Sequence, residues 1–477
     1  MTAHTARTRW LALIVLCLGS LMIVLDTTIV NVALPSIRDD LGFSATSLAW
    51  VVNGYMLTFG GFLLLGGRLG DLFGHRKMFL IGLALFTIAS LACGIAQSQI
   101  TLIAARAAQG LGGAVVSAVA LSLIMNLFTE PVERAKAMGF FGFVSAGGGS
   151  LGVLLGGVIT NSFDWHWNFL VNVPIGIAVF ILCLFLLPKK HERAPGHVDI
   201  VGAVTVTAAL MLAVYAIVNG NDLGWTSGTT LGMLGGAVVL LVAFVILESK
   251  IKHPLVPLSL FRLRNVVVAN SAGVLWAGGM FAWFFLSALY LQLILKFNPL
   301  QVGLSFLPAN AIMAVFSLGL SAKIVLRYGI RTSLTTGLAL ITLGLLLLAR
   351  APVDGTFVAH VLPSMLLLGF GSGIAFNPML LAAMNDVPQH ESGLASGVVN
   401  TAFMMGGALG LAVLASVAAS TSANLLAEGT EELAALNGGY HAAFIVGGIF
   451  AGLATLLVGT QLRTAKVSGK AHVAAMH

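Results

Sequence analysis

Apolar stretches of about 20 residues recur along the whole chain, separated by short polar connections. A helix of that length rises about 30 Å, the thickness of the hydrocarbon core of a bilayer. The stretches are continuous rather than alternating, so they predict membrane-spanning helices and exclude a closed β-barrel. We expect an all-α integral membrane protein with fourteen such helices, at residues 10–33, 47–66, 78–97, 101–126, 136–160, 167–187, 199–218, 229–247, 266–293, 302–325, 332–350, 357–382, 396–420 and 440–462.

Two longer polar connections, at 188–199 and 248–265, divide these helices into groups of six, two and six. They predict four parts: an N-terminal six-helix bundle at 1–187, a cytoplasmic linker with two extra transmembrane helices at 188–265, a C-terminal bundle at 266–463 and a cytoplasmic tail at 464–477. A weak internal repeat supports the two bundles, because LGGRLGDLFGHRKMFLIG at 65–82 aligns with LSAKIVLRYGIRTSLTTG at 320–337. Parallel repeats of this kind occur in secondary transporters that hold their substrate between two halves.

Composition and charge agree with a membrane protein. Of the 477 residues 58% are hydrophobic and 9% are charged, whereas a soluble domain carries about 25% charged residues. If the amino terminus is cytoplasmic, most of the 24 Lys and Arg residues lie in cytoplasmic segments, while the acidic residues divide about evenly. Both termini are therefore expected in the cytoplasm of a multi-pass protein of the cell (inner or plasma) membrane. The basic excess indicates topology and requires no nucleic-acid partner.

The first apolar run is too long for a signal-peptide core and has no small-residue cleavage site after it, so we expect it to remain as a helix. Cys17, Cys93 and Cys183 all lie in apolar runs. They are more consistent with small core residues than with a disulfide or metal site.

Two charged residues lie well inside predicted helices, away from the helix ends, where burial costs several kcal/mol. Counted at about 1.5 Å per residue, Asp26 lies roughly 12 Å and Arg106 roughly 8 Å below the outer ends of their helices. Their depths are similar, so they are candidates for a buried pair, formed directly or through Gln109. Arg106 has an alternative, since a long side chain can reach the near interface. Asp26 is too short to do so, which favours a functional role.

Five motifs occur in order along the chain: LDTTIVNVALP at 25–35, GRLGDLFGHRK at 67–77, LIAARAAQGLGGA at 102–114, GGSLGVLLGG at 148–157 and DWHWNFLVNVPIG at 164–176. Together they resemble the motifs of the major facilitator superfamily and, within it, the fourteen-helix drug:proton antiporter family (DHA2). The resemblance covers nearly the whole chain. It implies proton-driven multidrug efflux and antibiotic resistance, with Asp26 and Arg106 in proton coupling.

The resemblance also implies two gating motifs. Motif A comprises Gly67, Arg68, Asp71, Gly74 and Arg76, with glycines that allow a tight turn and a close approach of two helices. In it, Asp71 and Arg68 would latch the two bundles together at the cytoplasmic side. An ordinary charged turn that fixes topology is the alternative for Arg76.

Motif C of the fifth helix, which distinguishes exporters from importers in this family, corresponds to Gly148, Gly152, Gly156 and Gly157. Val153 occupies the position where the family has a proline. Generic close packing of helices explains these glycines equally well.

A cavity for bulky apolar compounds is expected to use adaptable aromatic and methionine side chains with a few polar groups. The candidates are Asn31, Asn53, Gln109, Trp276, Phe281, Trp283, Asn377, Phe403 and Met404.

The sequence therefore predicts a proton-coupled exporter of amphipathic, drug-like or antibiotic compounds that works by alternating access. The alternative is a proton-coupled importer of a small polar solute on the same fold. The sequence contains no GxxxxGK[ST] loop for ATP, and no serine–histidine or metal-ligand pattern indicates an enzyme. We expect no cofactor and no metal, because the proton gradient supplies the driving force. The expected partners are a small-molecule substrate, protons and the lipid bilayer, with the protein acting as a monomer.

Overall fold

The computed structural model describes residues 6–128, 130–187, 199–251, 254–316, 320–384, 386–387 and 392–463. The first eleven residues of the predicted linker, 188–198, and the predicted tail, at 464–477, lie outside these residues. Within the described ranges the chain is helical and has no strand, as its apolar runs predicted.

The helices fall into three consecutive groups. The first half of the molecule consists of α1 (Ala6–Leu41), η1 (Ser47–Ala49), α2 (Trp50–Phe73), α3 (His75–Gly94), α4 (Gln99–Leu127), α5 (Pro131–Ser162), α6 (Trp167–Leu170) and α7 (Asn172–Leu186). It is followed by α8 (Ile200–Leu223) and α9 (Gly228–Lys250). The second half consists of η2 (Leu258–Arg262), α10 (Arg264–Leu289), η3 (Tyr290–Ile294), α11 (Pro299–Val315), α12 (Ser321–Tyr328), α13 (Ile330–Leu348), η5 (Phe357–Val361), α14 (Leu362–Met384), α15 (Ser392–Ala427) and α16 (Glu432–Gln461).

Twelve helical stretches in the described part of the chain are long and apolar enough to cross a membrane. They coincide with twelve of the fourteen predicted runs. Of the other two runs, 136–160 falls on α5, and 302–325 covers most of α11 and the start of α12. The apolar stretches there, Leu151–Ser162 and Pro299–Val315, are shorter.

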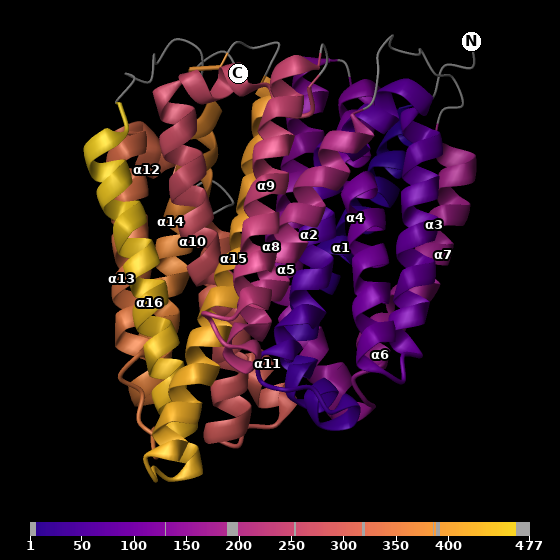
Figure 1. The fold of residues 1–477 in the computed structure, drawn as a ribbon. Coiled ribbons are helices and arrows are strands. Elements are labelled where there is room, and N and C mark those ends of the chain that lie inside the picture. The colour runs from indigo at the N-terminus through magenta and orange to yellow at the C-terminus, as the bar shows by residue number, and fades with distance from the viewer. Residues whose placement is uncertain are drawn as a thin grey trace.

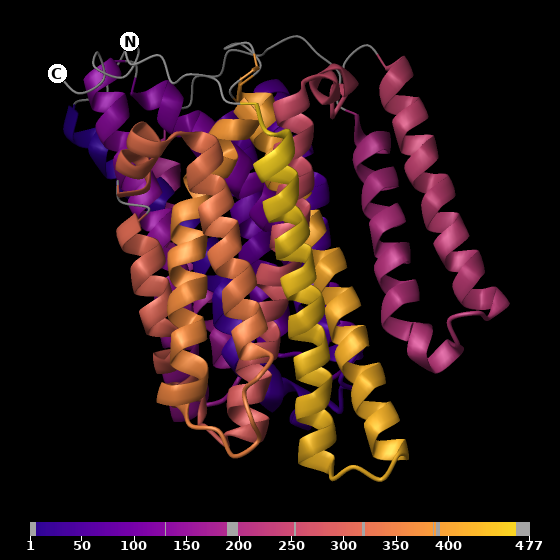
Figure 2. The same ribbon diagram turned by 90° about the vertical axis from the view of Figure 1, so that its left-hand side faces the viewer.

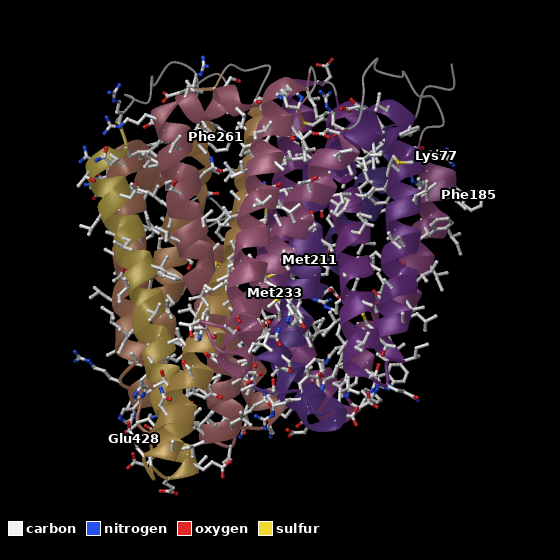
Figure 3. The ribbon with its side chains drawn as sticks, in the orientation of Figure 1. Lys77, Phe185, Met211, Met233, Phe261 and Glu428 are labelled. Carbon is white, nitrogen blue, oxygen red and sulfur yellow. The ribbon has the colours of Figure 1, made fainter. Side chains whose placement is uncertain are left out.

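α1 begins and α16 ends at the same end of the bundle, the upper end in Figure 1. We call this end proximal and the opposite end distal. Lys77 lies at the proximal end and Glu428 at the distal end (Figure 3). α8 and α9 form a hairpin that leans away from the rest of the bundle (Figure 2), and α8 packs against α2 and α15.

The two copies of the sequence repeat make equivalent contacts. Gly74 joins α2 to α3 with φ 101°, and Gly329 joins α12 to α13 with φ 82°, a backbone region that favours glycine. Arg76 donates from Nη2 to Leu184 O in α7, the last helix of the first half, at 2.7 Å. Arg331 donates in the same way to Gly459 O in α16, the last helix of the second half.

A further repeat position sets helix packing in both halves. A Cβ at Gly82 would lie 3.0 Å from Gly112 O in α4, and a Cβ at Gly337 would lie 2.8 Å from Gly371 O in α14. The third and fourth helices of each half therefore approach each other at matching glycines. The repeat is thus a feature of the fold as well as of the sequence.

Candidate functional site

Asp26 and Arg106 form an ion pair in the interior of the first half. Arg106 Nη1 donates to Asp26 Oδ2 at 2.5 Å, and the two residues are 1% and 0% exposed, respectively. Removing one partner from such a pair leaves an uncompensated buried charge, which costs about 3–5 kcal/mol. The structure therefore brings together the two residues that the sequence placed at similar depth.

Gln109 lies one turn after Arg106 on α4 and bridges the pair. Its Nε2 donates to Asp26 Oδ1 and to Ser90 Oγ of α3, at 2.7 Å in each case, and its Oε1 accepts from Arg106 Nη1 at 2.6 Å. Asn172 of α7 donates from Nδ2 to the same Asp26 Oδ1 at 3.0 Å. Asp26 thus accepts hydrogen bonds from three side chains on two other helices.

α2 holds the guanidinium of Arg106 from the other side. Arg106 Nε donates to Val51 O at 2.9 Å, and the guanidinium carbon lies 4.5 Å from the centroid of the Tyr55 ring. The Phe169 ring lies 5.5 Å away. This reach depends on close packing, because a Cβ at Gly110 of α4 would clash with the backbone carbonyl of Tyr55.

Sequence reasoning missed Ser90, Tyr55, Phe169 and Asn172 as parts of this site. Asn172 carried a usable signal, since it is an amide inside an apolar run and lies within one of the quoted motifs. Ser90 and the two aromatic residues are ordinary components of membrane helices, and only the tertiary structure distinguishes them.

Both carboxylate oxygens of Asp26 face N–H donors. Oδ1 accepts from Gln109 and Asn172, and Oδ2 accepts from Arg106. Hydrogen bonds between ionised groups are the stronger ones, so the contact with Arg106 depends most on the negative charge of the carboxylate.

The glycines of motif C place α5 against the helix that carries Asp26. A Cβ at Gly152 would lie 2.8 Å from Leu25 O, and one at Gly156 would lie 2.5 Å from Ile29 O. Gly148 faces the same helix, and a Cβ added there would lie 3.0 Å from Leu21 Cδ1. Only residues without a side chain allow this approach.

The next glycine of the motif faces the other half. A Cβ at Gly157 would lie 2.6 Å from Pro299 O of α11 and 3.3 Å from Gly303 Cα. Val153, at the expected proline position, is buried. Its carbonyl oxygen faces Gly303 of α11, where an added Cβ would lie 2.9 Å from that oxygen. α5 therefore contacts α1 and α11 through neighbouring residues.

Motif A makes its described contacts within the first half. Asp71 Oδ1 lies 3.2 Å from His75 Nε2, one turn along the chain, and Arg68 is exposed. Arg76 reaches α7, as described above. Gly74 forms the turn, but Gly67 is not at a close helix contact, since a Cβ there would lie 3.9 Å from Ala118 Cβ. The latch between the halves stays a prediction.

Three of the aromatic candidates form one cluster in the second half, and a further ring joins them. Trp276 and Phe403 lie 5.3 Å apart with an angle of 73° between their planes, and Phe281 lies 6.0 Å from Phe403. Phe376, which was not predicted, lies 6.1 Å from Trp276. Trp283 is not in this cluster.

The remaining cavity candidates are more scattered. Trp283 packs against Phe284 and Phe306, with ring centroids 4.4 and 5.9 Å away. Asn377 is half-buried on α14, next to Phe376. Asn31 donates to backbone carbonyls of its own helix.

The aromatic cluster adjoins α2 at the seam between the halves. A Cβ at Gly407 of α15 would lie 2.5 Å from Phe281 Cδ2 and 2.6 Å from Met56 Cε of α2. Met404, one residue after Phe403, packs on Gly60 of α2. A Cβ added at Gly60 would lie 3.0 Å from the Cβ of Met404. α2 therefore contacts Arg106 with one face and the aromatic cluster with another.

Three of the candidates carry buried polar atoms that have no hydrogen-bond partner among the described residues. Asn53 is fully buried on α2, and neither its Nδ2 nor its Oδ1 has a partner there. The same holds for Nε1 of Trp276 and of Trp283. Buried polar groups in proteins are nearly always satisfied, so these atoms are available to a bound molecule.

Comparison with known proteins gives consistent matches over most of the chain. Residues 16–411 match the family model described as Major Facilitator Superfamily. The chain is 37% identical to the puromycin resistance protein pur8 of Streptomyces alboniger over 98% of this chain and 94% of that protein. It is 38% identical to the cephamycin export protein CmcT of Amycolatopsis lactamdurans, over 87% of this chain and 86% of the relative.

Among solved structures, the fold is similar to that of the proton:xylose symporter XylE, with a TM-score of 0.61. The match covers 97% of each chain at 16% sequence identity. This similarity concerns the fold alone.

Proposed function

This chain belongs to the major facilitator superfamily of membrane transporters, and from that premise we propose that it exports an amphipathic, drug-like compound in exchange for protons. It is a multi-pass membrane transporter rather than an enzyme. The observation that carries the proposal is the buried Asp26, which accepts hydrogen bonds from Arg106, Gln109 and Asn172.

Proton binding at Asp26 would couple to movement through the contacts of α1. A proton on the carboxyl removes its charge and weakens the charge-assisted hydrogen bond from Arg106, which loosens α1 from α4. α1 also reaches the second half, because Gln292 in η3 donates from Nε2 to Val32 O at 2.9 Å. α5 lies against the same part of α1 and against α11. A shift of α1 is thus transmitted to the seam between the halves.

The aromatic cluster and its neighbours support the substrate class. Trp276, Phe281 and Phe403 offer apolar faces, and Met404 adapts to different shapes. Asn53 and Trp276 hold the polar atoms that a substrate would satisfy. Relatives named for antibiotic resistance or export support export over import of a nutrient.

For the architecture, we propose that α5 and α11 complete a set of fourteen spans in a 6+2+6 arrangement. The proximal end, with Lys77, would be cytoplasmic, as the basic residues predict. The transporter would act as a monomer driven by the proton gradient, without a cofactor.

Export assays in bacterial cells that lack their own efflux pumps test the proposal. Cells that express the protein should accumulate less ethidium and survive more puromycin, and a protonophore should abolish both effects. Asp26→Asn should abolish them too, whereas Asp222→Asn, an exposed acid at the distal end of α8, should leave them unchanged. Export at the full rate by Asp26→Asn would contradict the coupling role. Growth on a nutrient only when the protein is present would contradict export.

A further inference from the structure

The α8–α9 hairpin carries two buried acids at its proximal end. Asp199 immediately precedes α8 and accepts from Gly202 N at 2.7 Å through Oδ1, as an N-cap. Glu248, in the last turn of α9, accepts from Val256 N at 2.9 Å through Oε2. The two residues are 9% and 3% exposed. Each carboxyl therefore uses one oxygen to hold the backbone of a nearby segment.

The second oxygen of each carboxyl faces the other acid. Asp199 Oδ2 and Glu248 Oε1 are buried without a hydrogen-bond donor among the described residues. Both border the same point, because a Cβ at Gly202 would clash with each of them. Glu248 Oε1 would lie 2.7 Å from that Cβ and Asp199 Oδ2 closer still, so the two oxygens are close neighbours.

No cation compensates the two acids in the described part of the chain, where neither forms an ion pair. The charged side chains of the elements packed around them are otherwise engaged or exposed. On α2, Arg68 is exposed and Asp71 contacts His75; on α9 and η2, Lys250 and Arg262 are exposed. Along α8 itself, Asp222 lies at the far, distal end. The described part of α15 that packs nearby, around Ala395 and Val398, contains no charged residue.

We propose that Asp199 and Glu248 bind one proton between them, at a site separate from Asp26. The proton comes from the solvent and forms an O–H on one carboxyl, which donates to the facing oxygen of the other. Two buried carboxylates this close repel each other when both are charged, whereas a shared proton leaves one charge and satisfies both facing oxygens.

The shared proton would fasten the hairpin to both halves of the transporter. Leu255 and Val256, held through Glu248, pack with Leu65 of α2 and Ala203 of α8. Val256 also packs against a second cluster that includes Ala395 of α15. Loss of the proton would add a second negative charge and separate the proximal ends of α8 and α9. This site responds to the pH at the proximal face and does not depend on which compound is transported.

Amide substitutions of each acid test the proposal in purified protein. Glu248→Gln and Asp199→Asn each supply an N–H donor to the remaining carboxylate, so neither variant needs the proton. The C=O stretching band of a protonated carboxylic acid should appear in the infrared difference spectrum of the unchanged protein minus Glu248→Gln at neutral pH. The control, Asp222→Asn, should give no such band.

The pH dependence of stability gives a second readout. A native state that holds one proton more than the unfolded chain loses stability as pH rises, with the unfolding constant growing up to about tenfold per pH unit. The apparent melting temperature in detergent should fall by about 1–3 °C between pH 6 and 8, and the fall should be smaller in both amide variants than in Asp222→Asn. An absent infrared band, or the same pH dependence in all variants, would overturn the proposal. Neither the infrared band nor the melting temperature depends on export. The export assays therefore test the exporter assignment independently of the shared proton.

Discussion

Arg106 makes contacts that another cation would not reproduce. Its Nη1 donates hydrogen bonds to Asp26 and Gln109, while its Nε donates to Val51 O on a different helix. A lysine has a single ammonium group on a flexible chain and cannot span these directions. The residue therefore compensates the carboxylate and also ties α4 to α2.

Substitutions of Arg106 should separate these two roles. Arg106→Met leaves Asp26 buried without a counter-charge and should destabilise the protein by about 3–5 kcal/mol. Arg106→Lys keeps the charge but loses the bond to Val51 O, which is expected to cost about 1–3 kcal/mol. Melting temperatures in detergent and export of ethidium should therefore rank the unchanged protein above the lysine variant and the lysine variant above the methionine variant. A methionine variant as stable as the unchanged protein would show that the ion pair is not structural.

Asn53 is the opposite case, a buried amide without a hydrogen-bond partner in the described part of the chain. Asn53→Leu removes two orphaned polar atoms at similar volume, so it should leave stability unchanged or raise it by about 1–3 kcal/mol. Export should nevertheless fall severalfold, because the substrate loses its polar contact. Asn400→Leu, at an exposed amide bonded to its own helix, is the matched control. A fall in stability for Asn53→Leu would reveal a structural role instead.

At the scale of elements, α5 connects the Asp26 helix to the second half. Its contact with α1 has no space for a side chain at Gly156, whereas a Cβ at Gly149 would lie 3.9 Å from Thr28 Cγ2. The glycines of motif C are therefore not equivalent to their neighbours.

This difference predicts unequal effects of the same substitution. Gly156→Ala should push α5 from α1 and destabilise the protein by about 1–3 kcal/mol, with a loss of export. Gly149→Ala should have little effect on either quantity. Melting temperature and export, measured side by side, check this prediction. Equal tolerance of both substitutions would mean that α1 and α5 do not need their close approach.

Sequence reasoning reached the elements more readily than the site. Helix positions follow from long apolar runs, and the depth of Asp26 and Arg106 follows from counting residues, so both were predictable. The packing of Trp276 against Phe376 of α14 and Phe403 of α15, and the bond from Asn172 to Asp26, depend on how helices rotate against one another. Helices that are apolar all round carry no periodicity that reveals this rotation.

At the scale of the whole molecule, the two halves use the same device to hold their last helix. Arg76 and Arg331 each donate to a backbone carbonyl there, although the halves share little sequence. Arg76→Met and Arg331→Met should therefore lower the melting temperature by similar amounts, each corresponding to about 0.5–1.5 kcal/mol. Lys77→Met, at the exposed neighbour of Arg76, should have no effect. A loss confined to one half would show that the repeat does not extend to these contacts.

The central claim concerns the proton on Asp26, and proton movement in proteoliposomes tests it most directly. With a pH-sensitive dye in the lumen and an imposed pH gradient, ethidium or puromycin should accelerate dissipation of the gradient by the unchanged protein. Asp26→Asn should still bind the compound but should show no such acceleration, while Asp222→Asn should behave as the unchanged protein. Substrate-dependent proton movement at the full rate in Asp26→Asn would contradict the account.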